Sequence, residues 1–151
     1  MGWLDSFVDR ECCDLVTVGR RSGKPRTTEL WFGVAGDEAL FISGTQRCDW
    51  RANLLANPEV TVVFDEVSRN GRARLVTDPD ERRRFGDVMG AKYDWSGDEE
   101  IGLTRDAWVY ECPLFAVGFD GEPVSGYESG SRIAISAFCV AMIARARSIT
   151  S

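Results

Sequence analysis

Four basic side chains gather within eight residues of an otherwise acidic chain. They are Arg20, Arg21, Lys24 and Arg26. No acidic residue occurs between Asp14 and Glu29, and Gly19 and Gly23 allow the backbone to turn and to present its N–H groups. Cations and backbone donors in one turn are the groups that bind phosphate or carboxylate. The stretch predicts an anion site, and a solvated basic hairpin tip is the alternative.

A second stretch has the residues of a phosphate site. Ser43 and Gly44 end a predicted strand, and the loop after them, which contains Arg47, leads into a predicted helix capped by Asp49. Backbone donors at a helix N-terminus, together with a hydroxyl, favour phosphate binding. The alternative is that Ser43 is an ordinary turn residue at a strand end.

Two residues of the same helix add an aromatic surface and an amide. Trp50 and Asn53 are three positions apart, so they can share one side of the helix. The alternative for Trp50 is a place in the hydrophobic core.

Composition excludes several kinds of site. The chain of 151 residues has no histidine, which removes the commonest zinc ligand and the usual general base. Its five cysteines form no CxxC motif and are odd in number, so we expect no metal site, no disulfide framework and a cytoplasmic location. Eighteen basic against 24 acidic residues give a net charge of −6, which disfavours nucleic-acid binding.

The elements that must position these residues are mostly strands. We expect strands at 14–18, 26–34, 39–43, 59–67, 72–77, 106–112 and 114–119, with a turn at 68–71. Helices are expected at 3–11, at 49–57 and from a cap at 78 to about 93. The pattern predicts a mainly β (α+β) domain over residues 1–130, about six antiparallel strands forming a barrel or a sandwich. Residues 131–151 form an apolar tail of uncertain structure, whose apolar run 133–144 is too short to span a bilayer.

The run from the basic turn to residue 64 resembles a known family. The fragments GRRSGKPR, LFISG and DWRANLLANPEVTV occur here in the order found in deazaflavin-dependent nitroreductases, and the later AKY is also similar. That family lies within the flavin and deazaflavin oxidoreductases related to pyridoxamine phosphate oxidases. The resemblance implies a split β-barrel that binds coenzyme F420, with FMN as the alternative cofactor.

The resemblance also implies roles for single residues. The anionic end of the cofactor would meet the turn, and its ring would lie near the second stretch, which gives the cofactor-binding residues Arg20, Lys24, Pro25, Arg26, Ser43, Gly44, Arg47, Trp50 and Asn53. Reduced F420 would then give a hydride to a nitro compound, quinone or enone, with Ser43, Tyr93 or water as the proton donor. A non-catalytic cofactor carrier is the other alternative. A homodimer is expected, with Trp31 and Trp108 as aromatic anchors.

Overall fold

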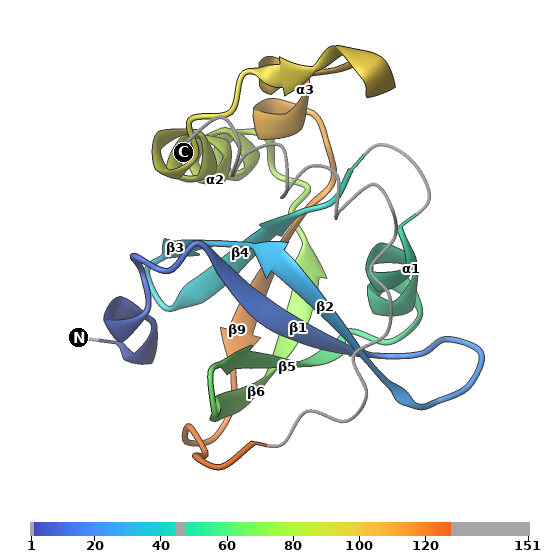
Figure 1. Ribbon diagram of the computed structural model, residues 1–151, viewed down its shortest axis with the longest axis vertical. Coiled ribbons are helices and arrows are strands. Elements are labelled where there is room, and N and C mark those ends of the chain that lie inside the picture. Colours follow the sequence, from blue (N-terminus) through green and yellow to red (C-terminus); the bar gives the residue numbers. More distant parts are fainter. Residues whose placement is uncertain (1, 45–47, 128–151) are drawn as a thin grey trace.

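The fold is built on one antiparallel sheet of seven strands in the order β2-β1-β5-β6-β9-β4-β3 (Figure 1). The computed structural model describes residues 2–44 and 48–127, so the predicted tail at 131–151 lies outside the described residues. The strands of the sheet are β1 (Cys12–Val18), β2 (Pro25–Trp31), β3 (Gly33–Ala35), β4 (Glu38–Ile42), β5 (Glu59–Phe64), β6 (Val67–Leu75) and β9 (Leu114–Phe119). The other elements are η1 (Trp3–Ser6), α1 (Asp49–Ala56), α2 (Pro79–Lys92), β7 (Gly97–Asp98), η2 (Glu99–Ile101), β8 (Leu103–Thr104) and α3 (Arg105–Tyr110).

The sheet curls because its two edges are consecutive in the chain. Strands β2 and β3 are the first and last in the sheet order, yet only Phe32 separates them. The chain therefore passes directly from one edge of the sheet to the other at Phe32. This confirms the mainly β, antiparallel split barrel, with seven strands in the main sheet instead of about six.

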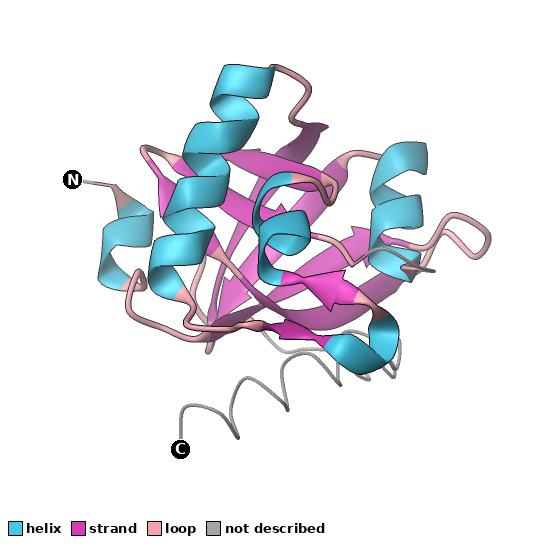
Figure 2. Ribbon diagram, turned by 90° about the horizontal axis from the view of Figure 1, so that it is seen from above, coloured by secondary structure: helices cyan, strands magenta, loops and turns pink. Residues whose placement is uncertain are grey.

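Strand alternation divides the apolar side chains between two cores. Leu30 and Phe32 belong to the cluster inside the barrel, whereas Trp31, between them, belongs to a second cluster with Met89 and Trp108. Helices α2 and α3 lie together over one side of the sheet, and α1 lies apart from them (Figures 1 and 2). The second core is therefore the layer between the sheet and α2 and α3.

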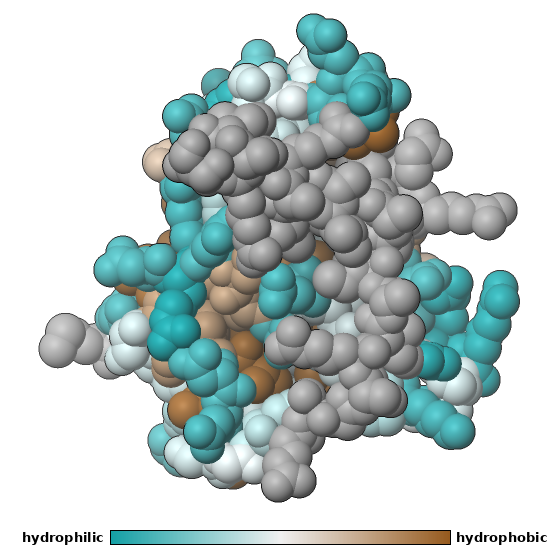
Figure 3. All heavy atoms as spheres, viewed as in Figure 1, coloured by the Kyte–Doolittle hydropathy of each residue, from teal (hydrophilic) through white to brown (hydrophobic). Residues whose placement is uncertain are grey.

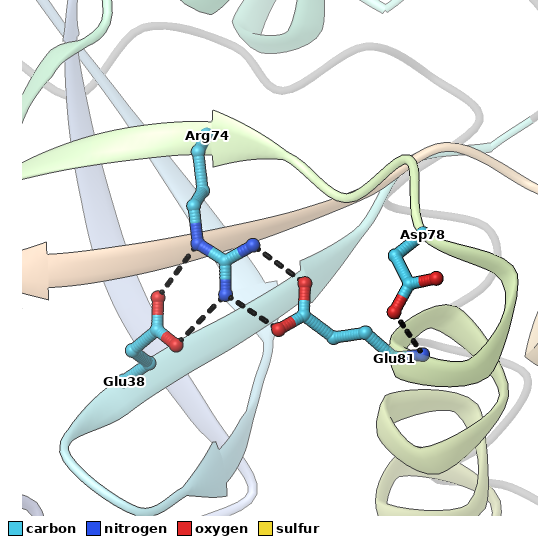
Figure 4. Close-up of polar contacts among 4 residues, drawn as sticks. All are labelled: Glu38, Arg74, Asp78 and Glu81. Carbon is cyan, nitrogen blue, oxygen red and sulfur yellow. Dashed lines mark hydrogen bonds and ion pairs between the residues drawn. The ribbon is translucent and has the colours of Figure 1, made fainter.

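Helix α2 begins as its sequence predicts and is tied to the sheet by ion pairs. Asp78 Oδ2 accepts a hydrogen bond from the Glu81 backbone N–H at 3.3 Å, and Pro79 occupies the first helical position. Arg74 of β6 binds Glu38 of β4 at 2.9 Å and Glu81 at 2.6 Å (Figure 4). These hydrogen bonds raise the pKa of Arg74 and lower that of Glu81. All three side chains are partly exposed, so the pairs orient α2 more than they stabilise it.

Helices α2 and α3 satisfy each other's C-terminal carbonyl groups. Arg82 of α2 donates to the carbonyl oxygens of Val109 at 2.6 Å and Cys112 at 2.8 Å. In return, Arg105 of α3 donates to those of Tyr93 and Trp95, both at 2.8 Å. Because carbonyl groups at helix ends otherwise lack partners, this exchange fixes the two helices against each other.

Three sequence predictions about secondary structure are wrong. The helix expected at 3–11 is limited to the 3-10 helix η1, Trp3–Ser6. Residues 106–112 are not a strand; they lie in and just after α3, whose N-cap Thr104 accepts a hydrogen bond from the Ala107 N–H. The turn predicted at 68–71 lies instead between Phe64 and Val67, where Asp65 has a φ of 56°. Residues 68–71 are part of β6.

In the described ranges, no helix is long and apolar enough to cross a bilayer. Those same ranges contain no cluster of three or more acidic or cysteine side chains that could hold a metal ion.

Candidate cofactor site

The basic turn (residues 19–26) consists of the six-residue connection between β1 and β2 and the first two residues of β2. Gly19 donates to the Lys24 carbonyl oxygen at 2.8 Å, and Gly23 adopts the left-handed conformation with a φ of 71°. The turn projects from the barrel on the right of Figure 1, and the surface there is hydrophilic in Figure 3. The basic turn is therefore a hairpin tip. Whether it can also bind a ligand depends on the contacts of its four cations.

Among the described residues, three of the four cations of the turn have no ion-pair partner. The side chains of Arg21 and Lys24 are exposed and have no hydrogen-bond or ion-pair partner among the described residues. Arg26 has a single long contact within them, from Nη2 to Ser22 Oγ at 3.5 Å. An unpaired cluster of cations on an acidic chain favours an anionic ligand.

Arg20 is the exception, because α1 holds it. Its backbone N–H and its Nη1 donate to Asn53 Oδ1, at 3.1 and 3.0 Å, and its Nη2 pairs with Asp49 at 3.3 Å. Asn53 in turn donates from Nδ2 to Thr17 Oγ1 at 3.1 Å. The sequence placed Arg20 with the ligand-binding cations, whereas the structure uses it to attach the turn to α1. Thr17 is a buried polar residue within β1, and nothing in its sequence context marks it as part of the site.

Ser43 and Gly44 also contact α1. Arg51 donates from Nη1 to the Gly44 carbonyl oxygen at 2.9 Å and to Ser43 Oγ at 3.3 Å. The Ser43 side chain is fully buried, and its backbone N–H donates to the Pro113 carbonyl oxygen at 2.9 Å. The structure therefore brings the basic turn and this strand end to the same helix. Arg47 lies outside the described residues.

Trp50 takes the alternative role that its sequence left open. Its side chain is only 3% exposed, belongs to the barrel core and packs edge-on against Phe115, with ring centres 5.8 Å apart. The indole therefore presents no flat surface for a ligand. The N-cap of α1 is Cys48, one residue before the predicted Asp49.

Tyr93 lies at the other end of the barrel from the basic turn. Its hydroxyl accepts from the Phe32 N–H at 3.1 Å and lies 2.6 Å from the Glu11 carbonyl oxygen, to which it donates. Burial raises the pKa of Tyr93. In the β1–β2 pair, Val18 and Pro25 are partners at the end next to the turn, and Cys12 and Trp31 are partners at the opposite end. Phe32, which contacts Tyr93, directly follows Trp31. Six residues of strand separate the two ends, which is about 20 Å.

Two open grooves lie near these ends. One, of about 380 Å³, adjoins the basic turn and is lined in part by Val16, Val18, Gly23 and Pro25. The other, of about 350 Å³, lies at the Tyr93 end and is lined in part by Trp31, Lys92 and Trp95. Lys92 donates to the Phe32 carbonyl oxygen at 2.9 Å, and burial lowers its pKa to about 8. Only the first groove is next to the unpaired cations.

The model of the F420H(2)-dependent quinone reductase family matches residues 7–102, which include the basic turn and α1. The chain belongs to this family. No curated protein matches its sequence at a significant level.

Solved structures share the fold of this F420H(2)-dependent quinone reductase family member at low sequence identity. An F420-H2 dependent reductase, FDR-A, is 22% identical with a TM-score of 0.57, over 72% of this chain and 94% of that one. A conserved hypothetical protein from Mycobacterium tuberculosis is 19% identical with a TM-score of 0.61, over 88% and 91%. The heme storage protein HutZ from Vibrio cholerae is 18% identical with a TM-score of 0.62, over 81% and 91%. These likenesses show the split-barrel fold alone.

Proposed function

We propose that the protein binds reduced coenzyme F420 and uses it to reduce a small organic acceptor such as a quinone, a nitro compound or an enone. One observation carries the proposal: a turn with three available cations is fixed to α1 in a chain of the F420H(2)-dependent quinone reductase family. If the hairpin tip were only a solvent-exposed loop, its first cation, Arg20, would not need a hydrogen bond to the buried amide of Asn53.

The residues present suit the anionic end of such a cofactor. F420 carries a phosphate and an acidic tail, and Arg21, Lys24 and Arg26 offer charge-assisted donors on one turn. Pro25 lines the groove beside them. Ser43 and Gly44 would shape the wall nearer the ring, because α1 holds them beside the turn.

When bound, reduced F420 supplies the hydride, and the protein supplies binding, orientation and exclusion of water. Neither candidate hydroxyl is available as a proton donor at the acceptor. Ser43 is fully buried and its Oγ lies 3.3 Å from Gly44 O and from Arg51 Nη1, while Tyr93 is bonded to backbone groups about 20 Å along the strands from the turn. We therefore assign the proton to water.

FMN and heme are two alternatives to F420, and the residues of the chain suit only FMN. FMN also carries a phosphate, so the same cations would hold it. HutZ is a heme storage protein, but the present chain has no histidine, the commonest axial ligand of heme iron. We therefore test FMN as the rival cofactor and do not propose heme binding.

We also propose that the protein forms a homodimer. One structure that shares the fold, at 22% identity and a TM-score of 0.56, is a domain-swapped dimer. The anchors predicted from the sequence are wrong, since Trp31 is 5% exposed and Trp108 is 1% exposed, both within the second core. Any dimer must use other side chains.

The deciding experiment is a titration with oxidised F420 and, separately, FMN, followed by turnover with reduced F420 and a quinone, a nitroaromatic and an enone. We expect binding of F420 and steady oxidation of its reduced form with at least one acceptor. Lys24→Ala should weaken binding, whereas Arg83→Ala, which removes an equal charge from the exposed face of α2, should not. Turnover with reduced FMN, assayed in the same way, and none with reduced F420 would contradict the cofactor assignment, and binding without turnover would favour a carrier.

A further inference from the structure

We infer that Asn53 is a positioning residue that holds the basic turn in the shape required to bind the anionic end of the cofactor. The inference rests on the proposed function, because it assigns a role within the same site. Asn53 need not touch the ligand: it acts through Arg20, at the start of the turn.

Asn53 uses both ends of its amide for this purpose. Its Oδ1 accepts two hydrogen bonds from Arg20, one from the backbone and one from the guanidinium, and its Nδ2 donates to Thr17. Asn53 is 3% exposed and Thr17 is 1% exposed. Hydrogen bonds shielded from water are stronger, and a buried amide with no partner would be costly, so this arrangement of α1, β1 and the turn is well defined.

The turn transmits the position of Arg20 to the other cations. It is narrow: a Cβ at Gly19 would lie 2.6 Å from Ser22 Oγ and 3.2 Å from the Lys24 carbonyl oxygen. Gly19, directly before Arg20, also donates to the Lys24 carbonyl oxygen at 2.8 Å, so we expect a displacement of Arg20 to move Lys24 as well. The hydrogen bond to Asn53 also directs the Arg20 guanidinium toward α1 and away from the space beside Arg21 and Lys24.

Such preorganisation affects affinity without adding a contact to the ligand. A turn that is already ordered loses little conformational freedom when it binds, whereas a loose turn must be ordered by the ligand. Arg51, two residues before Asn53 on α1, holds Ser43 and Gly44 in a comparable way. Helix α1 thus sets the positions of two parts of the site from within a single helical turn.

The test compares three variants of the full chain. Asn53→Ala removes all three hydrogen bonds and should weaken F420 binding at least tenfold. Asn53→Asp keeps an acceptor for both Arg20 bonds, and the Thr17 hydroxyl can donate to its carboxylate, so its affinity should stay within threefold of wild type. Asn57→Ala is the matched control, because Asn57 Oδ1 binds the Glu59 N–H at the other end of α1. It should leave binding unchanged.

Two further measurements separate positioning from a general loss of structure. Hydrogen exchange of the Arg20 amide should accelerate in Asn53→Ala and not in Asn57→Ala, with both variants folded by urea titration. In a double-mutant cycle, Asn53→Ala should cost much less in a Lys24→Ala background, because both changes disable the same turn. Full additivity, or F420 binding by folded Asn53→Ala within threefold of wild type, would overturn the inference.

The experiment also distinguishes this inference from the proposed function. If the wild type binds FMN and not F420, the cofactor assignment fails, and the same variants titrated with FMN decide the role of Asn53 by the same criteria. If the wild type binds F420 and only the Asn53 effects are missing, the inference fails alone. If the wild type binds neither phosphate-bearing cofactor, both are overturned.

Discussion

Replacing Gly86 with alanine tests how closely α2 and α3 pack. A Cβ at Gly86 would lie 2.4 Å from the Val109 carbonyl oxygen and 2.9 Å from a ring carbon of Tyr110. Separations below 3.0 Å are not tolerated, so one of the two helices must shift. The Val109 oxygen cannot move easily, because Arg82 holds it at 2.6 Å.

The expected cost is the difference between two effects. Forcing an extra methyl group into a packed contact costs about 1–3 kcal/mol, and the rigid backbone partner favours the upper half of that range. Alanine in place of glycine within a helix stabilises it by about 1 kcal/mol. The net loss should be about 1–2 kcal/mol, which lowers the melting temperature of a chain of this length by about 2–8 °C.

Gly90 provides the control on the same helix. A Cβ there would lie 3.3 Å from Arg105 Nη2 and at least 3.5 Å from the Val109 side chain, close to ordinary contacts. Gly90→Ala should therefore be neutral or slightly stabilising. Thermal and urea unfolding of both variants measure the comparison. A Gly86→Ala variant as stable as Gly90→Ala would refute the packing argument.

Three other predictions follow from the site and the cores. Lys24→Ala and Arg26→Ala should each weaken F420 binding by about 1.5–3 kcal/mol, roughly tenfold to a hundredfold, by loss of a charge-assisted contact; unchanged affinity in both would exclude the anion site. Burial lowers the pKa of Lys92 from 10.5 to about 8, so the unfolded chain binds more protons between those values and stability should rise with pH there. Between pH 7 and 10 the free energy of unfolding of the wild type should rise by about 1–2 kcal/mol relative to that of Lys92→Met, after allowance for solvent screening. A difference between the two proteins that stays constant over this range would contradict the prediction. Light scattering at micromolar concentration should give the mass of a homodimer, and a monomer mass would reject that proposal.

The sequence predicted the elements whose signals are local. Helix α2 carries its cap at Asp78 and its proline at the first position, and it appears where expected. Strand β5 is rich in β-branched residues and begins where expected, although it ends at Phe64 and not at residue 67. Helix α3 has six residues, too few to show helical periodicity, and its adjacent Trp108 and Val109 are both buried. Its local signal was the N-cap, Thr104.

The misplaced turn has a different cause. Asn70 and Gly71 form the dipeptide typical of a two-residue hairpin, which favoured a turn at 68–71. The structure uses Gly71 for close packing, because a Cβ there would lie 2.4 Å from the Gly118 carbonyl oxygen of β9. A glycine that permits two strands to approach cannot be distinguished in sequence from one that permits a turn.

The candidate site was predicted in outline and not in its internal roles. The cations and the strand end could be found because their residue types and spacing are chemically distinctive. The commitment of Arg20 to Asn53 joins residues 33 positions apart, and the burial of Trp50 depends on Phe115 of β9. Such roles depend on the tertiary fold, which residue spacing alone does not describe.

The Tyr93 hydroxyl determines how the molecule can open. It joins the chain just before β1, the β2–β3 junction at Phe32 and the end of α2, through contacts with Glu11 and Phe32 backbone groups. Peeling α2 away from the sheet would expose the second core and also leave the buried Phe32 N–H without a partner. Release of the helical layer is thereby coupled to release of the strand that closes the barrel. Because partial unfolding would be penalised at both places at once, we expect the two cores to unfold as a single cooperative unit.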